Sequence, residues 1–312
     1  MIGPLVVGVA QRSPTISAGT TLFRGRKITE SFNKERGIKV ADLSHPPSHC
    51  TRLGRVNRAN QPFFYCSASQ EVIYYEIQGL SKGDEIVLSY WRTKAPLVVN
   101  NIGYTQFLFE TLGAKRPLPT WMGDQTHQEL TLADEAAVKA QFAVLHSRAD
   151  NREIRGAISK AFMADVGENE QYEYKLTAAI AELHMGNDQS PVQFAGILYP
   201  TIRMAANGDN LALKPERVAT YLEFFKAKHI KIDDRNGSTI SFSIIDFSDS
   251  VLEDGNLRWK GRAPAFTLPS GDTGIFSCEE GRDEDGDYLI SADGKVCHWV
   301  ARDQRGNILK LG

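Results

Sequence analysis

Apolar residues in the first third of the chain alternate between short continuous runs and helical spacing. Residues 63–66 form an apolar run bounded by proline and serine, which favours a strand. Ile73 and Ile77 then lie four residues apart, on one face of a helix that one of the preceding serines can cap. Glu76 lies about 100° round this helix from Ile77, so we expect it at the edge of the buried stripe.

The same reasoning places further elements along the chain. Strands are predicted at residues 20–24, 85–91, 96–100, 193–203 and 211–213. Helices are predicted where apolar residues recur every three or four positions, within residues 104–112, 131–145, 172–183 and 215–225. Gly113 and Gly186 are the expected helix stops. Two adjacent prolines exclude a helix within residues 25–53, so this stretch is predicted to be a long surface loop.

The pattern changes after residue 230, where short apolar runs separated by turn residues replace helical spacing. Strands are predicted at residues 240–247, 257–259, 274–278, 288–290, 296–300 and 308–311, with tight turns at 293–294 and 305–307. The chain is therefore predicted to be α+β, with a mixed domain at 1–230 and a β-rich extension or small domain at 231–312.

Composition narrows the class of protein. The net charge is −2 and the sequence has no long basic run that would bind the phosphates of nucleic acid, so no nucleic-acid partner is expected. The apolar residues form no run near the roughly 18 to 20 needed to span a bilayer. The N-terminus lacks the positive residues of a secretory signal. Four cysteines without Cys-x-x-Cys spacing indicate free thiols, and the expected location is the cytoplasm.

Four short blocks, in this order, resemble the RES domain family, which is named for an arginine, a glutamate and a serine. They are Phe23-Arg24, Gly54-Arg55-Val56-Asn57, the stretch from Tyr65 to Glu76, and Gly196 to Arg203. The resemblance covers roughly residues 20 to 230, and the spacing from the tyrosine to the closing glutamate matches that of the family.

The chain departs from the family pattern at three places. Val56 stands where an aromatic residue is usual, and Ser69-Gln70-Glu71 stands where Ser-Pro-Glu is common. Thr201 occupies the position of the named serine, which keeps a hydroxyl and adds a methyl group. The stretch between Glu76 and Thr201 is also longer than in compact members, which have no counterpart of the tail beyond residue 230.

The resemblance implies a fold and an activity. Members of the RES family act as toxins of bacterial toxin–antitoxin pairs and degrade NAD⁺. Their fold is similar to that of ADP-ribosyltransferases, so we expect a curved, mixed and largely antiparallel sheet with flanking helices around an NAD⁺ cleft. The expected activity is NAD⁺ glycohydrolase or phosphorylase, with NAD⁺ as substrate and an antitoxin protein as partner. Homo-oligomerisation stays open. Two alternatives also stay open: a mono-ADP-ribosyltransferase with a macromolecular target, and a non-catalytic module that binds NAD⁺ or ADP-ribose.

The resemblance also assigns roles to five residues. Glu76 would stabilise positive charge on the ribose, and Arg55 would clamp phosphate with its planar guanidinium. Thr201 would donate to a phosphate or ribose oxygen, and these three are the expected catalytic residues. Arg24 would be a second cation for the pyrophosphate, and Tyr65 would stack on nicotinamide or donate its hydroxyl. Each residue also has a structural alternative. Glu76 could be a solvated helix residue, Arg55 could bind loop carbonyls, and Thr201 could be an ordinary sheet residue. Arg24 could form a surface ion pair, and Tyr65 could belong to the core.

Other signals in the sequence do not support a cofactor site. His45, His49 and Cys50 lack an evident fourth metal ligand, and the acidic stretch 283–287 lacks the glycine and closing glutamate of a calcium loop. No metal is therefore expected. Neither Gly-x-Gly-x-x-Gly nor a P-loop occurs, which disfavours a Rossmann dehydrogenase or an NTPase.

Overall fold

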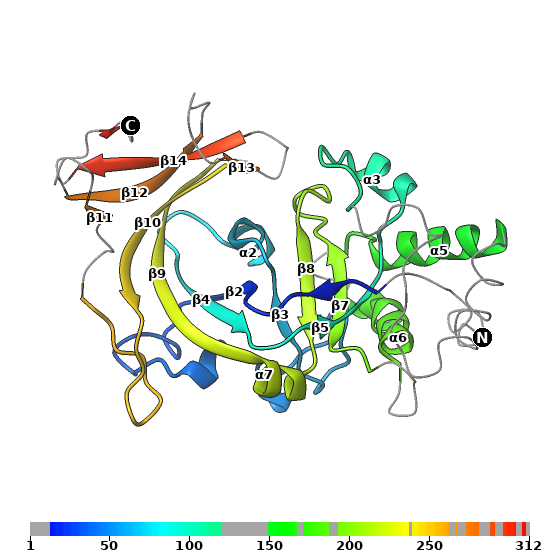
Figure 1. Ribbon diagram of the computed structural model, residues 1–312, viewed down its shortest axis with the longest axis horizontal. Helices are drawn as coiled ribbons and strands as arrows, with labels where there is room; N and C mark the ends of the chain where they lie inside the picture. The colour runs from blue at the N-terminus through cyan, green and yellow to red at the C-terminus, as the bar shows by residue number, and fades with distance from the viewer. Residues whose placement is uncertain are drawn as a thin grey trace.

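The computed structural model confirms the predicted α+β class (Figure 1). It describes residues 13–119, 149–166, 171–186, 193–236 and 239–261, together with strand segments at 266–267, 273–280, 288–290, 296–303 and 308–309. Two sheets, each of four strands, build the part of the molecule that contains the predicted site residues.

The first sheet is antiparallel throughout, in the order β10-β9-β4-β2. Its strands are β2 (Thr21–Lys27), β4 (Glu85–Thr93), β9 (Leu222–Asn236) and β10 (Thr239–Ser248). Register shifts interrupt the β4–β9 and β9–β10 pairings, and such bulges bend a strand and increase its twist. β9 and β10 are visibly bowed (Figure 1), so this sheet curves around the middle of the molecule.

The second sheet has the order β3-β8-β7-β6. Its strands are β3 (Phe64–Cys66), β6 (Asn100–Asn101), β7 (Gly196–Pro200) and β8 (Asp209–Leu213). β6 and β7 pair in parallel, whereas the other pairings are antiparallel. A separate short pairing joins β1 (Thr15–Ile16) to β5 (Leu97–Val98).

The helices divide between the two sheets. α2 (Gln70–Glu76) lies between them in Figure 1, and its Ile73 and Tyr74 pack against β4 and β10. α3 (Gln106–Leu112), α5 (Ala149–Phe162) and α6 (Tyr174–Met185) pack on the second sheet, whereas α7 (Pro215–Tyr221) leads into β9. Gly113 and Gly186 are the C-cap residues of α3 and α6, as predicted. In the part of the chain that the structure describes, no helix is long and apolar enough to cross a membrane.

Several local predictions were wrong. Within residues 25–53, β2 continues to Lys27, two 3₁₀ turns (η1, Val40–Leu43, and η2, Ser48–Cys50) follow, and the side chains of Phe32, Ile38 and Leu43 are buried. These apolar residues have no helical or strand period, so the pattern did not reveal that the segment belongs to the core.

The helix predicted over residues 215–225 ends at Tyr221, because Leu222 already pairs with Thr93 of β4. At the start of α2, Ser69 occupies the N-cap position, but its hydroxyl donates to the Glu71 carboxylate instead of accepting from the helix. Ser67 accepts from the Ser69 amide at 3.0 Å.

The expected division at residue 230 falls inside β9. Residues on both sides of it belong to the same ladder, because Lys226 pairs with Tyr90 and Lys231 pairs with Glu85. Of the predicted tail strands, 240–247 is β10 of the first sheet, and 257–259 is wrong because only an isolated bridge of Leu257 to Val251 forms there. The other four are β12 (Thr273–Glu280), β13 (Tyr288–Ile290), β14 (Val296–Asp303) and β15 (Ile308–Leu309), which form a further antiparallel sheet with β11 (Phe266–Thr267), a strand that was not predicted. The helix expected at 131–145, the turns at 293–294 and 305–307 and the acidic stretch at 283–287 lie outside the described residues.

Two lysines of β9 share one aromatic neighbour. The ammonium groups of Lys226 and Lys228 lie 4.4 and 5.4 Å from the centre of the Tyr90 ring. Among the described residues neither lysine forms an ion pair. Burial, and to a smaller extent the charge of Lys226, lower the pKa of Lys228 to about 8 from the ordinary 10.5.

We expect Lys228→Met to raise the free energy of unfolding at pH 7, with the gain shrinking as the pH rises from 8 to 10.5. In that window the unfolded wild type binds a proton that the folded wild type has lost, so wild-type stability rises with pH relative to the variant. Urea denaturation at pH 7 and pH 10 measures this. Lys231→Met, which removes an exposed lysine of the same strand, is the control and should change stability little at either pH. An equal gain for Lys228→Met at both pH values would contradict the prediction.

Candidate functional site

A cavity of about 530 Å³ opens where the end of α2, β2 and the β7–β8 hairpin meet. Four of the five predicted site residues line it: Arg24, Arg55, Tyr65 and Glu76. The remaining lining comes from several parts of the chain: Gly25, Arg52, Leu53, Gly54, Asn57, Cys66, Ile73, Ile77, Gln78, Asp165, Tyr174, Tyr199, Pro200, Ile202, Arg203 and Asn210. The fold therefore brings together residues that lie far apart in the sequence.

Glu76 is the last residue of α2, and a close approach of this helix to β2 sets its position. A Cβ atom on Gly25 would lie 2.4 Å from Cγ2 of Ile73 and 2.7 Å from Cδ1 of Ile77. The absence of a side chain at Gly25 thus lets α2 lie directly on the strand. As predicted, Ile73 and Ile77 share the buried face, and Glu76 lies at its edge, half-buried and facing the cavity.

One oxygen of the Glu76 carboxylate receives two hydrogen bonds. Oε1 accepts from the Thr201 hydroxyl and, at 2.7 Å, from the Asn210 side-chain amide. Within the described residues, no hydrogen bond reaches Oε2. The carboxylate is therefore fixed through one oxygen and leaves the other for a ligand.

Thr201 lies behind Glu76 and not on the cavity surface. Its side chain is fully buried, and its hydroxyl donates to Glu76, whereas the sequence resemblance implied a bond to a phosphate or ribose oxygen. Asn210, which lies just before the strand predicted at 211–213, supplies the second hydrogen bond. β8 begins two residues earlier than predicted, and Asn210 pairs with Tyr199 across the hairpin. A strand starting at Asp209 would have placed Asn210 beside Tyr199 from the sequence.

Arg24 is a cation held among apolar and aromatic groups. Its guanidinium donates to the Tyr65 carbonyl at 2.8 Å and lies 5.4 Å from the centre of the Phe64 ring. Burial lowers the pKa of Arg24 to about 10, so the side chain keeps its charge at neutral pH. No ion pair of Arg24 occurs among the described residues, and its Nε has no hydrogen-bond partner there. A half-buried cation without a carboxylate partner favours an anion in the adjacent cavity.

Arg55 makes the contacts that were the alternative to a phosphate clamp. Its guanidinium donates to the carbonyls of Phe162 and, at 3.0 Å, Ala164, and lies 5.4 Å from the centre of the Tyr174 ring. These contacts join the loop of Arg55 to the end of α5. Arg52 and Arg203, whose side chains are exposed, also line the cavity. The sequence analysis assigned a role in the site to neither of these two arginines.

Tyr65 contributes its ring to the cavity, while its hydroxyl is already engaged. The hydroxyl donates to Asn57 Oδ1 at 2.6 Å and accepts from the Val56 amide at 3.2 Å, and burial raises the pKa of Tyr65. Asn57 also donates to two carbonyls of its own loop at 2.8 Å, so it fixes the shape of this loop. Burial likewise raises the pKa of Tyr199. The rings of Tyr65 and Tyr199 are thus neutral aromatic surfaces.

Replacing Thr201 separates the role of its hydroxyl from that of its shape. Thr201→Val keeps the volume and removes the donor, so Glu76 Oε1 loses one of its two hydrogen bonds. A hydrogen bond to a charged group contributes roughly 1.5–3 kcal/mol, and Glu76 is half-buried, so we expect the free energy of unfolding to fall by the lower end of this range, about 1.5–2 kcal/mol. Thr201→Ser keeps the donor and is the control, with a smaller loss. Urea denaturation measures both variants. Equal stability of Thr201→Val and wild type would contradict a stabilising hydrogen bond from Thr201 to Glu76.

The lining combines a carboxylate with one open oxygen, several arginines and three tyrosine rings. Such a set suits a ligand that has anionic, hydroxyl and aromatic parts. Among the described residues, no three His, Cys, Asp or Glu side chains gather as metal ligands would. When the chain was compared with protein-family models, with curated proteins and with solved structures, no match was found.

Proposed function

We propose that the chain cleaves the nicotinamide N-glycosidic bond of NAD⁺ in the cavity at the end of α2. The proposal rests on the Glu76 carboxylate, whose Oε1 is held by Thr201 and Asn210 while the side chain faces the cavity. A carboxylate fixed in this way is suited to a positive charge that develops in the transition state. We also propose that the curved sheet and the hairpin around the cavity form an ADP-ribosyltransferase-like fold.

The chemistry requires no general acid for the leaving group. When the bond between ribose C1′ and the nicotinamide nitrogen breaks, its electron pair leaves with nicotinamide, which becomes neutral. The ribose becomes oxocarbenium-like, and the Glu76 carboxylate stabilises this charge by its field and by a hydrogen bond to a ribose hydroxyl. An oxygen of water or phosphate then bonds to C1′. Water yields ADP-ribose and a released proton, and phosphate yields the phosphorylated sugar.

The rest of the lining matches the rest of the substrate. Arg24, Arg52 and Arg203 supply cations for the pyrophosphate, and guanidinium groups suit phosphate oxygens. The rings of Tyr65, Tyr174 and Tyr199 supply surfaces for stacking. In this assignment Arg55 shapes the cavity through the carbonyls of α5 and the residues after it.

Incubating the purified chain with NAD⁺ and following free nicotinamide tests the proposal. Parallel reactions with and without phosphate distinguish phosphorolysis from hydrolysis by the sugar product. With NAD⁺ labelled on the adenylate, label transferred to a macromolecule would instead identify a transferase. Saturable NAD⁺ binding without any nicotinamide release would identify a binding module and overturn the proposed cleavage, whereas label transfer would overturn water or phosphate as the acceptor.

A further inference from the structure

The turn that joins β7 to β8 brings together both hydrogen-bond donors of Glu76. Thr201 begins the turn directly after β7, and Asn210 follows it as the second residue of β8. Their side chains reach the same carboxylate oxygen. The separation and orientation of these two donors therefore depend on the shape of residues 201–208.

This turn has a conformation that needs outside support. Ala205 and Ala206 adopt left-handed backbone angles, with φ values of 47° and 62°, which non-glycine residues rarely do. Bonds inside the turn hold part of the shape. The Thr201 amide donates to the Gly208 carbonyl at 2.9 Å, and the Ala206 amide donates to the Thr201 carbonyl at 2.8 Å. The Ala206 carbonyl accepts no backbone hydrogen bond inside the turn, and the Gly208 carbonyl can accept a second bond beside that of the Thr201 amide.

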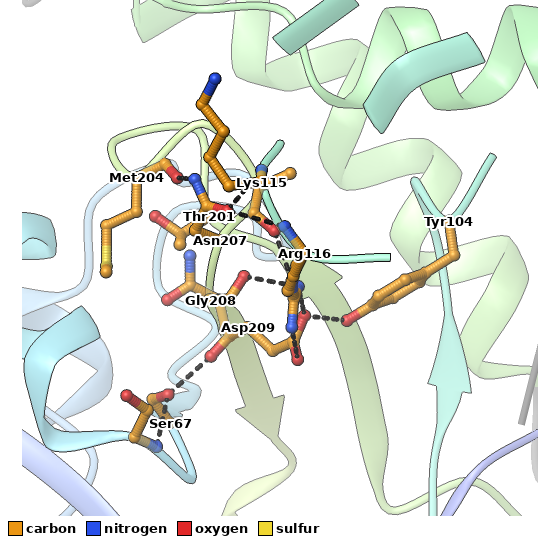
Figure 2. Close-up of polar contacts among 12 residues, drawn as sticks. Ser67, Tyr104, Lys115, Arg116, Thr201, Met204, Asn207, Gly208 and Asp209 are labelled. Carbon is orange, nitrogen blue, oxygen red and sulfur yellow. Dashed lines mark hydrogen bonds and ion pairs between the residues drawn. The ribbon is translucent and has the colours of Figure 1, made fainter. Parts of the chain in front are cut away.

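Arg116 supplies donors to both carbonyls from outside the turn (Figure 2). Its Nε donates to the Ala206 carbonyl at 2.6 Å, and one terminal nitrogen donates to the Gly208 carbonyl at 3.0 Å. Both terminal nitrogens also bind the two carboxylate oxygens of Asp209, one of them at 2.8 Å. The Tyr104 hydroxyl donates to the same carboxylate at 2.7 Å. Only a planar guanidinium can make this set of bonds at once.

Two further contacts connect the turn with its surroundings. Asn207 Oδ1 accepts from the backbone amides of Lys115 and Arg116, at 2.8 and 3.3 Å. On the opposite side, the Ser67 hydroxyl donates to the Asp209 carbonyl at 2.6 Å. Ser67 follows β3 and precedes α2, the helix that ends at Glu76. The turn is therefore fixed between the segment of Arg116 and the start of α2.

We propose that Arg116 is a positioning residue for the site: it fixes the β7–β8 turn so that Thr201 and Asn210 orient the Glu76 carboxylate. Arg116 does not line the cavity, so it acts on the ligand only through this turn. The inference rests on the proposed function where it concerns turnover. It extends that function because Arg116, which lies outside the cavity lining, would affect the rate of the chemical step.

Arg116→Lys tests the inference, because lysine keeps the charge but not the planar fork. We expect kcat for nicotinamide release to fall about 10-fold or more, since small misplacements of a catalytic group have effects of this size, while KM stays within about two-fold. Arg58→Lys is the matched control. Arg58 forms a similar two-nitrogen contact with Glu182, at 3.0 and 2.5 Å, on an exposed surface away from the turn. This control should leave both constants unchanged.

An unchanged kcat in Arg116→Lys, or a fall in kcat matched by Arg58→Lys, would overturn the inference. If Arg116→Lys does not fold, Asp209→Asn replaces it, because this variant weakens the same contact at constant size. The same fall in kcat is expected of it, and an unchanged kcat would overturn the inference. Backbone hydrogen exchange separates this inference from the proposed function. The Thr201 and Ala206 amides should exchange about 10-fold faster or more in Arg116→Lys than in Arg58→Lys, even if the wild type cleaves no NAD⁺. Equal exchange rates would overturn the positioning role whatever the activity.

Discussion

Glu76→Gln is expected to lower the rate of nicotinamide release from NAD⁺ about 100-fold or more while leaving the fold intact. Glutamine has the size of glutamate and keeps an oxygen that can accept from Thr201 and Asn210, so the buried hydrogen bonds survive. The negative charge is lost, and with it the stabilisation of the oxocarbenium-like ribose. The rate of nicotinamide release at saturating NAD⁺ is the measurement, with the thermal midpoint as the check on folding.

Glu71→Gln is the matched control for this variant. Glu71 belongs to the same short helix, but its carboxylate contacts the Ser69 hydroxyl and does not line the cavity. The two variants remove the same charge from the same helix, so a general electrostatic effect would slow both equally. Wild-type turnover in Glu76→Gln would refute the assignment of Glu76.

Gly196→Ala is expected to destabilise the fold by about 3 kcal/mol, because added volume in a packed interior forces backbone shifts. A Cβ atom at Gly196 would lie 2.0 Å from the Ala212 carbonyl oxygen and 2.9 Å from the Leu213 Cα atom. These are backbone atoms of the paired strand, so no side-chain rotation relieves the overlap. β7 and β8 would have to separate where Gly196 pairs with Leu213, at the end of the ladder away from the turn. Urea denaturation should show a lower midpoint at an unchanged slope.

Gly156→Ala is expected to have the opposite effect on the stability of the fold. Gly156 lies inside α5, and a Cβ atom there would have no neighbour within 4 Å. Alanine favours helix over glycine by roughly 0.5–1 kcal/mol, so this variant should be slightly more stable than wild type. Comparable stability of the two glycine variants would show that the β7–β8 contact is looser than described.

Local patterns predicted the elements on which the site is built. The pair Ile73 and Ile77 was enough to place Glu76 at the edge of a buried stripe, because helical geometry fixes neighbours within one turn. The hydrogen-bond partners of Glu76 could not be predicted from local patterns. Thr201 and Asn210 lie 125 and 134 residues further along the chain, and no short-range pattern encodes which of their side chains reach the carboxylate.

The remaining errors have physical causes of the same kind. The role of Arg55 depends on where two carbonyls at the end of α5 lie, and backbone carbonyls have no sequence signature. Leu222 and Phe225 continued the helical spacing of Val218, yet tertiary pairing with β4 makes them part of a strand. Phe32 and Leu43 are buried in a segment whose apolar residues follow no helical or strand period, so periodicity gives no information there.

The pairing of β4 with β9 has a consequence for protein synthesis. β4 ends at Thr93, whereas its partner begins only at Leu222, so an emerging nascent chain leaves one edge of β4 open until most of the polypeptide has left the ribosome. Pairing between such distant segments is also slow to form. The donors that orient Glu76 emerge late as well, at residues 201 and 210. An incompletely translated chain therefore holds the glutamate without the partners that orient it, which confines the proposed activity to chains translated beyond the β7–β8 hairpin.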